Sequence, residues 1–273
     1  MEKERVDVLL VKQGLFESRE QAKRAVMAGE ILGENNERLD KPGVKIPVTT
    51  TLRMKGHKMP YVSRGGLKLA KALKVFNINV DSKTCLDIGS STGGFTDVML
   101  QNGARLVYAL DVGTNQLVWQ LREDPRVVVM EQTNFRYSKL DDFDQGQPTF
   151  ASIDVSFISL RLILPPLAQI LPIGGEVVSL IKPQFEAGRD KVGKRGIVHS
   201  HEVHRDVLAT VLNFAKENHF DVLGLDFSPI KGGQGNIEFL AHLKLSSKEG
   251  VLAPDIDIDK TLAAADEELN KKG

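Results

Sequence analysis

The sequence predicts an α/β protein whose main domain is a doubly wound, mostly parallel sheet, with a small separate domain before it. Short apolar runs alternate with helix-like segments: one run ends at Asp87, and others lie at 106–112, 127–132, 150–155 and 176–182. This alternation is typical of a parallel sheet with helices on both faces. Residues 220–228 and 237–245 read as two strands with no helix between them, which predicts one antiparallel strand.

The composition is that of an ordinary soluble globular protein. Of its 273 residues, 41% are hydrophobic and 26% are charged, with 36 basic and 36 acidic side chains. The single cysteine, Cys85, lies in an apolar run and cannot form an internal disulfide, which fits a reducing compartment. We recognise no signal peptide and no spanning helix in the sequence. We therefore expect a cytoplasmic protein.

Residues 1–55 are predicted to form a small domain of two helices and short strands. Residues 4–15 carry apolar side chains at near-helical spacing. Ser18 and Gln21 have the spacing of a capping box, which predicts a second helix that ends at Gly29. Short β-like pieces separated by turn residues follow it.

Basic side chains of this domain form a candidate RNA-binding surface. They are Arg5, Arg19, Lys23, Arg24 and Lys41. The domain resembles the αL RNA-binding fold, and the matching residues are Arg5, Asp7, Leu10, Ser18, Arg19, Ala22, Gly29 and 41–43. The resemblance implies contacts with RNA phosphates. A small helical domain with a solvated, charged face is the alternative reading.

Residues 56–62 are predicted to link this domain to the next, because they contain Gly, Pro and Lys without periodicity. The linker lies in a basic stretch: nine Lys or Arg residues and no Asp or Glu occur from Lys41 to Val80. Such a stretch in a neutral chain indicates a polyanionic partner, although a solvated linker would look the same. Arg64, just before the next helix, is a further RNA-binding candidate.

A glycine-rich turn follows the first strand of the main domain and is a candidate cofactor site. Its residues are Asp87, Gly89, Ser91, Gly93 and Gly94, spaced D-x-G-x-x-x-G-G instead of the G-x-G-x-x-G of dinucleotide enzymes. A carboxylate in this turn would repel a pyrophosphate but suits a cofactor with positive charge, such as S-adenosylmethionine. An ordinary glycine-rich turn is the alternative.

Three polar residues at the ends of later strands extend this cofactor site. Asp111 could accept hydrogen bonds from both ribose hydroxyls of a nucleoside cofactor, a feature that would also suit NAD. Asn134 could contact an adenine amine or could simply be a turn residue. Asp154 ends the fourth strand at the same edge of the sheet and is counted with both cofactor and catalytic candidates.

Four ionisable residues are predicted to meet at this edge. Asp154 and Lys182 each end a parallel strand, Glu238 begins the antiparallel strand, and Lys68 lies on the helix that precedes the first strand. Each of these side chains alone would be an ordinary surface charge. Their convergence at one edge of the sheet favours a catalytic site.

Lys68, Asp154, Lys182 and Glu238 match the K-D-K-E tetrad of ribose 2′-O-methyltransferases of the FtsJ class. With the αL-like domain and the stretches 63–69 and 152–160, the chain resembles the TlyA family over about residues 4–245. The resemblance implies an FtsJ-like, Rossmann-like S-adenosylmethionine methyltransferase domain over residues 63–246. It also implies rRNA processing by 2′-O-methylation of cytidine. Residues 247–273, with seven acidic and four basic side chains, are expected to form an acidic tail.

In the mechanism that we expect from this resemblance, Lys182 is the base that removes the 2′-hydroxyl proton, and Asp154 orients it. Lys68 and Glu238 complete the network. A lysine at its ordinary pKa of about 10.4 is a poor base at neutral pH. Burial and a second lysine lower that pKa, whereas carboxylates oppose the change.

Other functions remain open from the sequence. A non-catalytic RNA-binding or ribosome-assembly factor could keep this fold, and the hemolysin name used in the family raises a pore-forming protein. We expect ribosomal RNA or a ribosomal subunit as partner, and neither a membrane nor a metal. His199, His201 and His204 lack the H-E-x-x-H spacing of a zinc protease.

Overall fold

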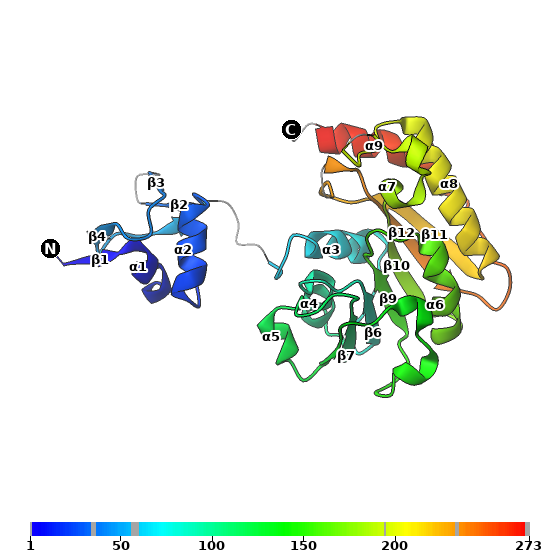
Figure 1. The fold of residues 1–273 in the computed structure, drawn as a ribbon, viewed down its shortest axis with the longest axis horizontal. Helices are drawn as coiled ribbons and strands as arrows, with labels where there is room; N and C mark the ends of the chain where they lie inside the picture. Colours follow the sequence, from blue (N-terminus) through cyan, green and yellow to red (C-terminus); the bar gives the residue numbers. More distant parts are fainter. Residues whose placement is uncertain (1, 34–36, 56–59, 194, 233–234, 271–273) are drawn as a thin grey trace. The chain divides into compact units, whose positions relative to one another are not determined.

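The computed structural model describes residues 2–33, 37–55, 60–193, 195–232 and 235–270 (Figure 1). The chain divides into two compact units, Met1–Pro60 and Tyr61–Gly273. Most of the expected linker, residues 56–59, lies outside the described residues. None of the helices in the described ranges is both long enough and apolar enough to cross a membrane.

The N-terminal unit consists of two helices with short strands. Its elements are β1 (Lys3–Arg5), α1 (Val6–Lys12), α2 (Arg19–Met27), β2 (Ile31–Leu32), β3 (Arg38–Leu39), β4 (Lys45–Pro47) and β5 (Arg53–Met54). The first helix is shorter than the 4–15 periodicity predicts, because Lys3–Arg5 pairs with β4 as a strand. The hydroxyl of Ser18 accepts a hydrogen bond from the N–H of Gln21, which confirms the predicted cap. The Gln21 side chain, however, accepts from the N–H of Glu17 and not from that of Ser18.

The second unit contains a seven-stranded sheet in the order β11-β12-β10-β9-β6-β7-β8. The strands are β6 (Thr84–Ile88), β7 (Leu106–Leu110), β8 (Val127–Met130), β9 (Phe150–Ile153), β10 (Glu176–Ile181), β11 (Phe220–Phe227) and β12 (Phe239–Leu245). Neighbouring strands are parallel except at β12, which runs antiparallel to both β10 and β11. This topology confirms the predicted doubly wound sheet with one antiparallel strand.

Helices cover both faces of the sheet (Figure 1). They are α3 (Gly66–Val75), α4 (Gly94–Gln101), α5 (Trp119–Arg122), α6 (Leu164–Ile170), α7 (Pro183–Glu186), α8 (His201–Glu217) and α9 (Ile258–Asn270), with 3₁₀ turns at Phe135–Tyr137, Leu140–Asp142, Leu160–Leu162 and Arg189–Lys191. Alternate residues of β6 serve opposite cores: Cys85 packs with α3 and α4, whereas Leu86 and Ile88 pack with α6 and α8. Both faces of the central strands are therefore buried against helices.

The C-terminal residues, expected as an acidic tail, contain a further helix, α9, after α8. Leu262, Ala265 and Leu269 of α9 are buried in the same core as α8 and β11. They recur every three or four residues, so the helix buries one face and leaves its acidic side chains on the other. The acidic composition of this segment concealed its apolar stripe.

Candidate active site

The strand register brings the predicted catalytic residues to one edge of the sheet. Ile88 of β6 lies beside Ile153, the last residue of β9, so Asp154, which follows β9, lies at the carboxyl edge. Ile181 of β10 pairs with Phe239 of the antiparallel β12, so Lys182 and Glu238 lie next to each other at that edge. The topology therefore produces this convergence without any unusual local structure.

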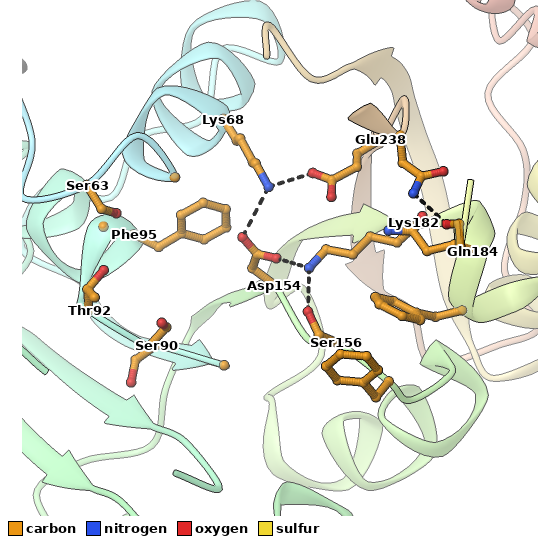
Figure 2. A pocket seen from close by; sticks show the side chains of 18 of the residues that line it. Ser63, Lys68, Ser90, Thr92, Phe95, Asp154, Ser156, Lys182, Gln184 and Glu238 are labelled. Carbon is orange, nitrogen blue, oxygen red and sulfur yellow. Dashed lines mark hydrogen bonds and ion pairs between the residues drawn. The ribbon is translucent and has the colours of Figure 1, made fainter. Parts of the chain in front are cut away.

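The four side chains form a continuous chain of ion pairs (Figure 2). The Nζ of Lys182 lies 2.5 Å from Oδ1 of Asp154, and the Nζ of Lys68 lies 3.6 Å from Oδ2 of the same carboxylate. Lys68 is also 2.5 Å from Oε2 of Glu238. Lys68, Lys182 and Glu238 are buried. Asp154 therefore holds both lysines in one network.

Lys68 and Lys182 occupy different positions in this network. Burial alone would lower the pKa of Lys68, but Asp154 and Glu238 outweigh it and raise that pKa above its usual value. Lys68 is consequently a cation at neutral pH and cannot accept a proton. Within the described residues, Lys182 forms an ion pair with only one of these carboxylates, that of Asp154, and its Nζ also donates to the hydroxyl of Ser156 at 3.2 Å.

The network lies in the wall of a cavity of about 510 Å³, which Ser63, Ser90 and Gly94 also line. A second cavity of about 500 Å³ contains Asp111 and Asn134 in its wall. The two cavities share wall residues: Gly89, Ser91, Asp154, Ser156 and Phe157. A ligand of nucleoside size or larger could therefore extend from one cavity into the other.

The glycines of the turn after β6 are required mainly by the protein itself. Gly89 has a φ of 87°, and a Cβ there would lie 2.5 Å from the carbonyl oxygen of Asp154. A Cβ at Gly93 would meet the side chains of Leu121 and Leu117, at 2.3 and 2.7 Å. Gly89 and Gly94 also line the cavity, so the expected close approach to a ligand applies to these two.

Asp87 lies below the cavities and lines neither of them. Its fully buried carboxylate accepts hydrogen bonds from the hydroxyls of Thr96, at 2.7 Å, and Ser152, at 3.2 Å. Burial raises the pKa of Asp87 to about 7, although both hydroxyls oppose the change. The carboxylate of Asp87 faces Thr96 of α4 and Ser152 of β9, and its direct contact with a cofactor stays a prediction.

Asp111 and Asn134 both reach the second cavity, but each already has backbone partners. The carboxylate of Asp111 accepts from the N–H of Ser91 at 2.8 Å and from that of Gly113 at 2.7 Å. The Oδ1 of Asn134 accepts from the N–H of Arg136 at 3.2 Å, as a turn asparagine does. Its amide nitrogen is the part that remains available to a ligand.

Ser156 and Phe157 line both cavities; in the sequence they lie within the stretch 152–160 that resembles the TlyA family, but neither was a candidate for a role. The ring of Phe157 is 92% exposed, its backbone has a φ of 64°, and its centroid lies 5.1 Å from that of Phe185. A large exposed ring in the left-handed region is unusual and indicates a functional position. Their place directly after Asp154, within the stretch 152–160, is the sequence signal that could have identified them.

The basic candidates of the N-terminal unit fall into two groups. Arg5 and Arg19 both bind the buried carboxylate of Asp7, at 2.9 and 3.1 Å, so they also support the fold of this unit. Lys23, Arg24 and Lys41 are exposed. Arg64, in the second unit, is exposed as well.

We expect Asp7→Asn to destabilise the N-terminal unit by about 1–2 kcal/mol at pH 6, since a charged hydrogen bond is lost but both arginines are partly solvated. Arg5 and Arg19 lower the pKa of Asp7 to about 2, so its contribution is complete above pH 4 and is lost as the pH falls through 2. Hydrogen exchange of the α1 and α2 amides in the full chain measures this. Asp40→Asn, at an exposed residue, is the control. Equal protection of wild type and Asp7→Asn at pH 6 would contradict the prediction.

The histidine cluster has structural contacts. His204 is buried, and its Nε2 lies 3.1 Å from the carbonyl oxygen of Val198, while His201 contacts Asp266 of α9. Within the described part of the chain, no group of three or more His, Cys, Asp or Glu side chains is arranged to hold a metal ion.

Comparison with known proteins gives consistent matches. Residues 61–245 match the family model described as FtsJ-like methyltransferase. YqxC of Bacillus subtilis is 57% identical over 272 residues, covering 99% of this chain and 96% of YqxC. TlyA of Mycobacterium tuberculosis, described as a 16S/23S rRNA (cytidine-2′-O)-methyltransferase, is 39% identical over 259 residues, covering 93% of this chain and 94% of TlyA. A solved structure described as a hemolysin from Streptococcus thermophilus has a TM-score of 0.79 at 62% identity and covers 100% of this chain and 98% of that one.

Proposed function

The chain belongs to the FtsJ-like methyltransferase family, and we propose that it transfers a methyl group from S-adenosylmethionine to the ribose 2′-hydroxyl of a cytidine in ribosomal RNA. The buried chain of ion pairs through Lys68, Asp154, Lys182 and Glu238, in the wall of a cavity, is the observation that carries this proposal. The description of the related TlyA as a cytidine-2′-O-methyltransferase supports the choice of substrate. We place the activity in the cytoplasm, where ribosomal RNA is found.

The residues around the two cavities fit S-adenosylmethionine. Ser90 lies in the wall of the first cavity, and its buried hydroxyl has no hydrogen-bond partner among the described residues, as expected of a group that a bound ligand would satisfy. Asp111, in the second cavity, would bind the ribose hydroxyls, and the amide of Asn134 would contact the adenine. Asp154 contributes to both walls and supplies negative charge for a cofactor that carries a sulfonium.

Bound S-adenosylmethionine would supply a methyl group that its sulfonium already makes electrophilic. The chain itself must then orient a ribose 2′-hydroxyl and remove its proton. We assign the Nζ of Lys182 as the proton acceptor, with Asp154 and Ser156 fixing its position. Lys68 and Glu238 in turn hold the carboxylate of Asp154.

RNA would bind through both units of the chain. We propose that Arg5, Arg19, Lys23, Arg24, Lys41 and Arg64 contact phosphates, which gives affinity that falls as salt rises. The exposed ring of Phe157, beside the cavity that holds Lys182, would stack on a nucleobase of the substrate.

We expect Phe157→Ala to lower kcat/KM for RNA by about tenfold or more, because stacking one base on an aromatic ring contributes about 1–3 kcal/mol. Because Phe157 also lines the second cavity, affinity for S-adenosylhomocysteine should fall too, but by less than kcat/KM does. Steady-state transfer assays with RNA and calorimetry with S-adenosylhomocysteine measure the two effects. Phe157→Trp, which keeps an aromatic face, should retain most activity. A Phe157→Ala enzyme with unchanged kcat/KM would remove the ring from RNA recognition.

The proposed function is tested by transfer of tritiated methyl groups from S-adenosylmethionine to ribosomal RNA and to assembled subunits. Mass-spectrometric mapping of ribose methylation, with and without the protein, would then locate the modified nucleotide. We expect the label on the ribose of a cytidine. Cofactor binding without any transfer would indicate a non-catalytic RNA-binding or assembly factor instead.

A further inference from the structure

The loop that follows β7 forms one wall of the second cavity. Asp111, Val112 and Gln116 of this loop line the cavity. The loop has little apolar packing of its own near its tip: Val112 is 70% exposed, and Asn115 has a φ of 51°. The buried side chain of Leu117 anchors one end of residues 113–117, so polar contacts must hold the rest of the segment in place.

Glu131, the residue directly after β8, provides that support. Its carboxylate accepts hydrogen bonds from three consecutive backbone N–H groups, those of Asn115 at 2.8 Å, Gln116 at 2.9 Å and Leu117 at 3.1 Å. Its side chain is 11% exposed and also forms an ion pair with Arg122. Consecutive N–H groups converging on one anion form a rigid concave turn. Arg122, together with these N–H groups, lowers the pKa of Glu131 to about 2, so the carboxylate stays charged at all physiological pH values.

The same loop also contacts the glycine-rich turn after β6, which contributes Gly89 and Ser91 to the wall of the second cavity. The side chain of Leu117 occupies the space beside Gly93, where a Cβ would lie 2.7 Å from it. The N–H of Val118 donates to the carbonyl of Thr92 at 3.3 Å. Asp111 accepts a hydrogen bond from the N–H of Ser91. A shift of residues 113–118 would therefore move both walls around the proposed nucleoside position.

We propose that Glu131 is a positioning residue for the nucleoside part of the cofactor. It acts through the loop after β7, whose residues Asp111 and Gln116 line the cavity. This inference rests on the proposed function, because it assumes that the second cavity holds the nucleoside. Glu131 does not itself line either cavity and therefore acts on the ligand only through this loop. Removing its charge should weaken cofactor binding while leaving the catalytic network around Lys182 intact.

The test compares Glu131→Gln with wild type by calorimetry with S-adenosylhomocysteine and by steady-state methyl transfer. Gln keeps the size of the side chain but loses the charge and one acceptor oxygen. We expect the Kd for S-adenosylhomocysteine to rise about tenfold, which corresponds to about 1.4 kcal/mol. The kcat at saturating S-adenosylmethionine and the KM for RNA should stay within about twofold of wild type, the pattern of lost uniform binding.

Glu131→Asp, which restores the charge on a shorter side chain, should recover part of the affinity. Glu123→Gln, at an exposed residue just after α5, is the matched control and should bind as wild type does. Wild-type affinity in Glu131→Gln would overturn the inference. An equal loss of kcat and of affinity, with a thermal melt that shows unfolded protein, would overturn it as well, because Glu131 would then support the fold and not the cofactor in particular. Failure of wild type itself to bind S-adenosylhomocysteine would overturn the proposed function, and this inference with it.

Discussion

Replacing Lys182 by alanine is expected to reduce methyl transfer by about a thousandfold while S-adenosylhomocysteine still binds. A positioned general base contributes about 10²–10⁴-fold to a rate, and Lys182 is the amine that lines the cavity with one carboxylate partner and one hydroxyl partner. The fold should survive, since Asp154 keeps its contact with Lys68. Single-turnover transfer with preloaded cofactor measures the chemical step directly.

Two further variants make this prediction sharper. Lys182→Arg keeps a positive charge beside Asp154 but cannot lose its proton, so it should remain inactive if Lys182 is the base. Lys248→Ala removes an exposed lysine beyond the end of β12 and should have no effect. Substantial activity in Lys182→Arg would reassign Lys182 to orienting the hydroxyl, and activity in Lys182→Ala would remove it from the mechanism.

The convergence of Asp154, Lys182 and Glu238 at one edge of the sheet could be predicted from the sequence because it depends on topology. Asp154 and Lys182 end apolar runs that alternate with helices, and such runs form parallel strands whose ends meet at one edge. Glu238 begins a strand with no preceding helix, so antiparallel pairing brings it to the same edge. For these residues, position along a strand was sufficient.

The parts that the sequence did not reveal depend on side-chain direction and on backbone partners. The side chain of Asp87 points toward Thr96 and Ser152 because of the face of β6 on which it lies. Its position before a glycine-rich turn does not indicate that face. Glu131 binds N–H groups 14–16 residues earlier in the chain, and backbone donors leave no trace in the amino-acid letters. Residues that organise a loop are therefore harder to predict than those that react.

Gly89→Ala is expected to lower methyl transfer by about a hundredfold or more and to destabilise the second unit. The left-handed backbone at Gly89 costs a non-glycine residue about 1–3 kcal/mol. In addition, the new Cβ would lie 2.5 Å from the carbonyl oxygen of Asp154, a backbone atom that cannot move alone. The end of β9 must then shift and carry the Asp154 carboxylate away from Lys182, and misplacement of about 1 Å can reduce a rate by about 10².

Gly174→Ala separates backbone strain from the contact with Asp154, because its backbone strain is almost the same as that of Gly89→Ala. Gly174 has a φ of 86°, but a Cβ there would lie 3.9 Å from its nearest neighbour among the described residues, Cε of Lys244. Gly174 also precedes β10, at the edge of the sheet away from the site. We expect Gly174→Ala to lose stability in denaturant titrations while keeping its kcat. Loss of activity in Gly89→Ala alone would show that the contact with Asp154, and not strain in general, sets the catalytic geometry. Equal kcat values in the two variants would show that Asp154 tolerates the displacement, so that the chain of ion pairs can re-form around a moved strand end.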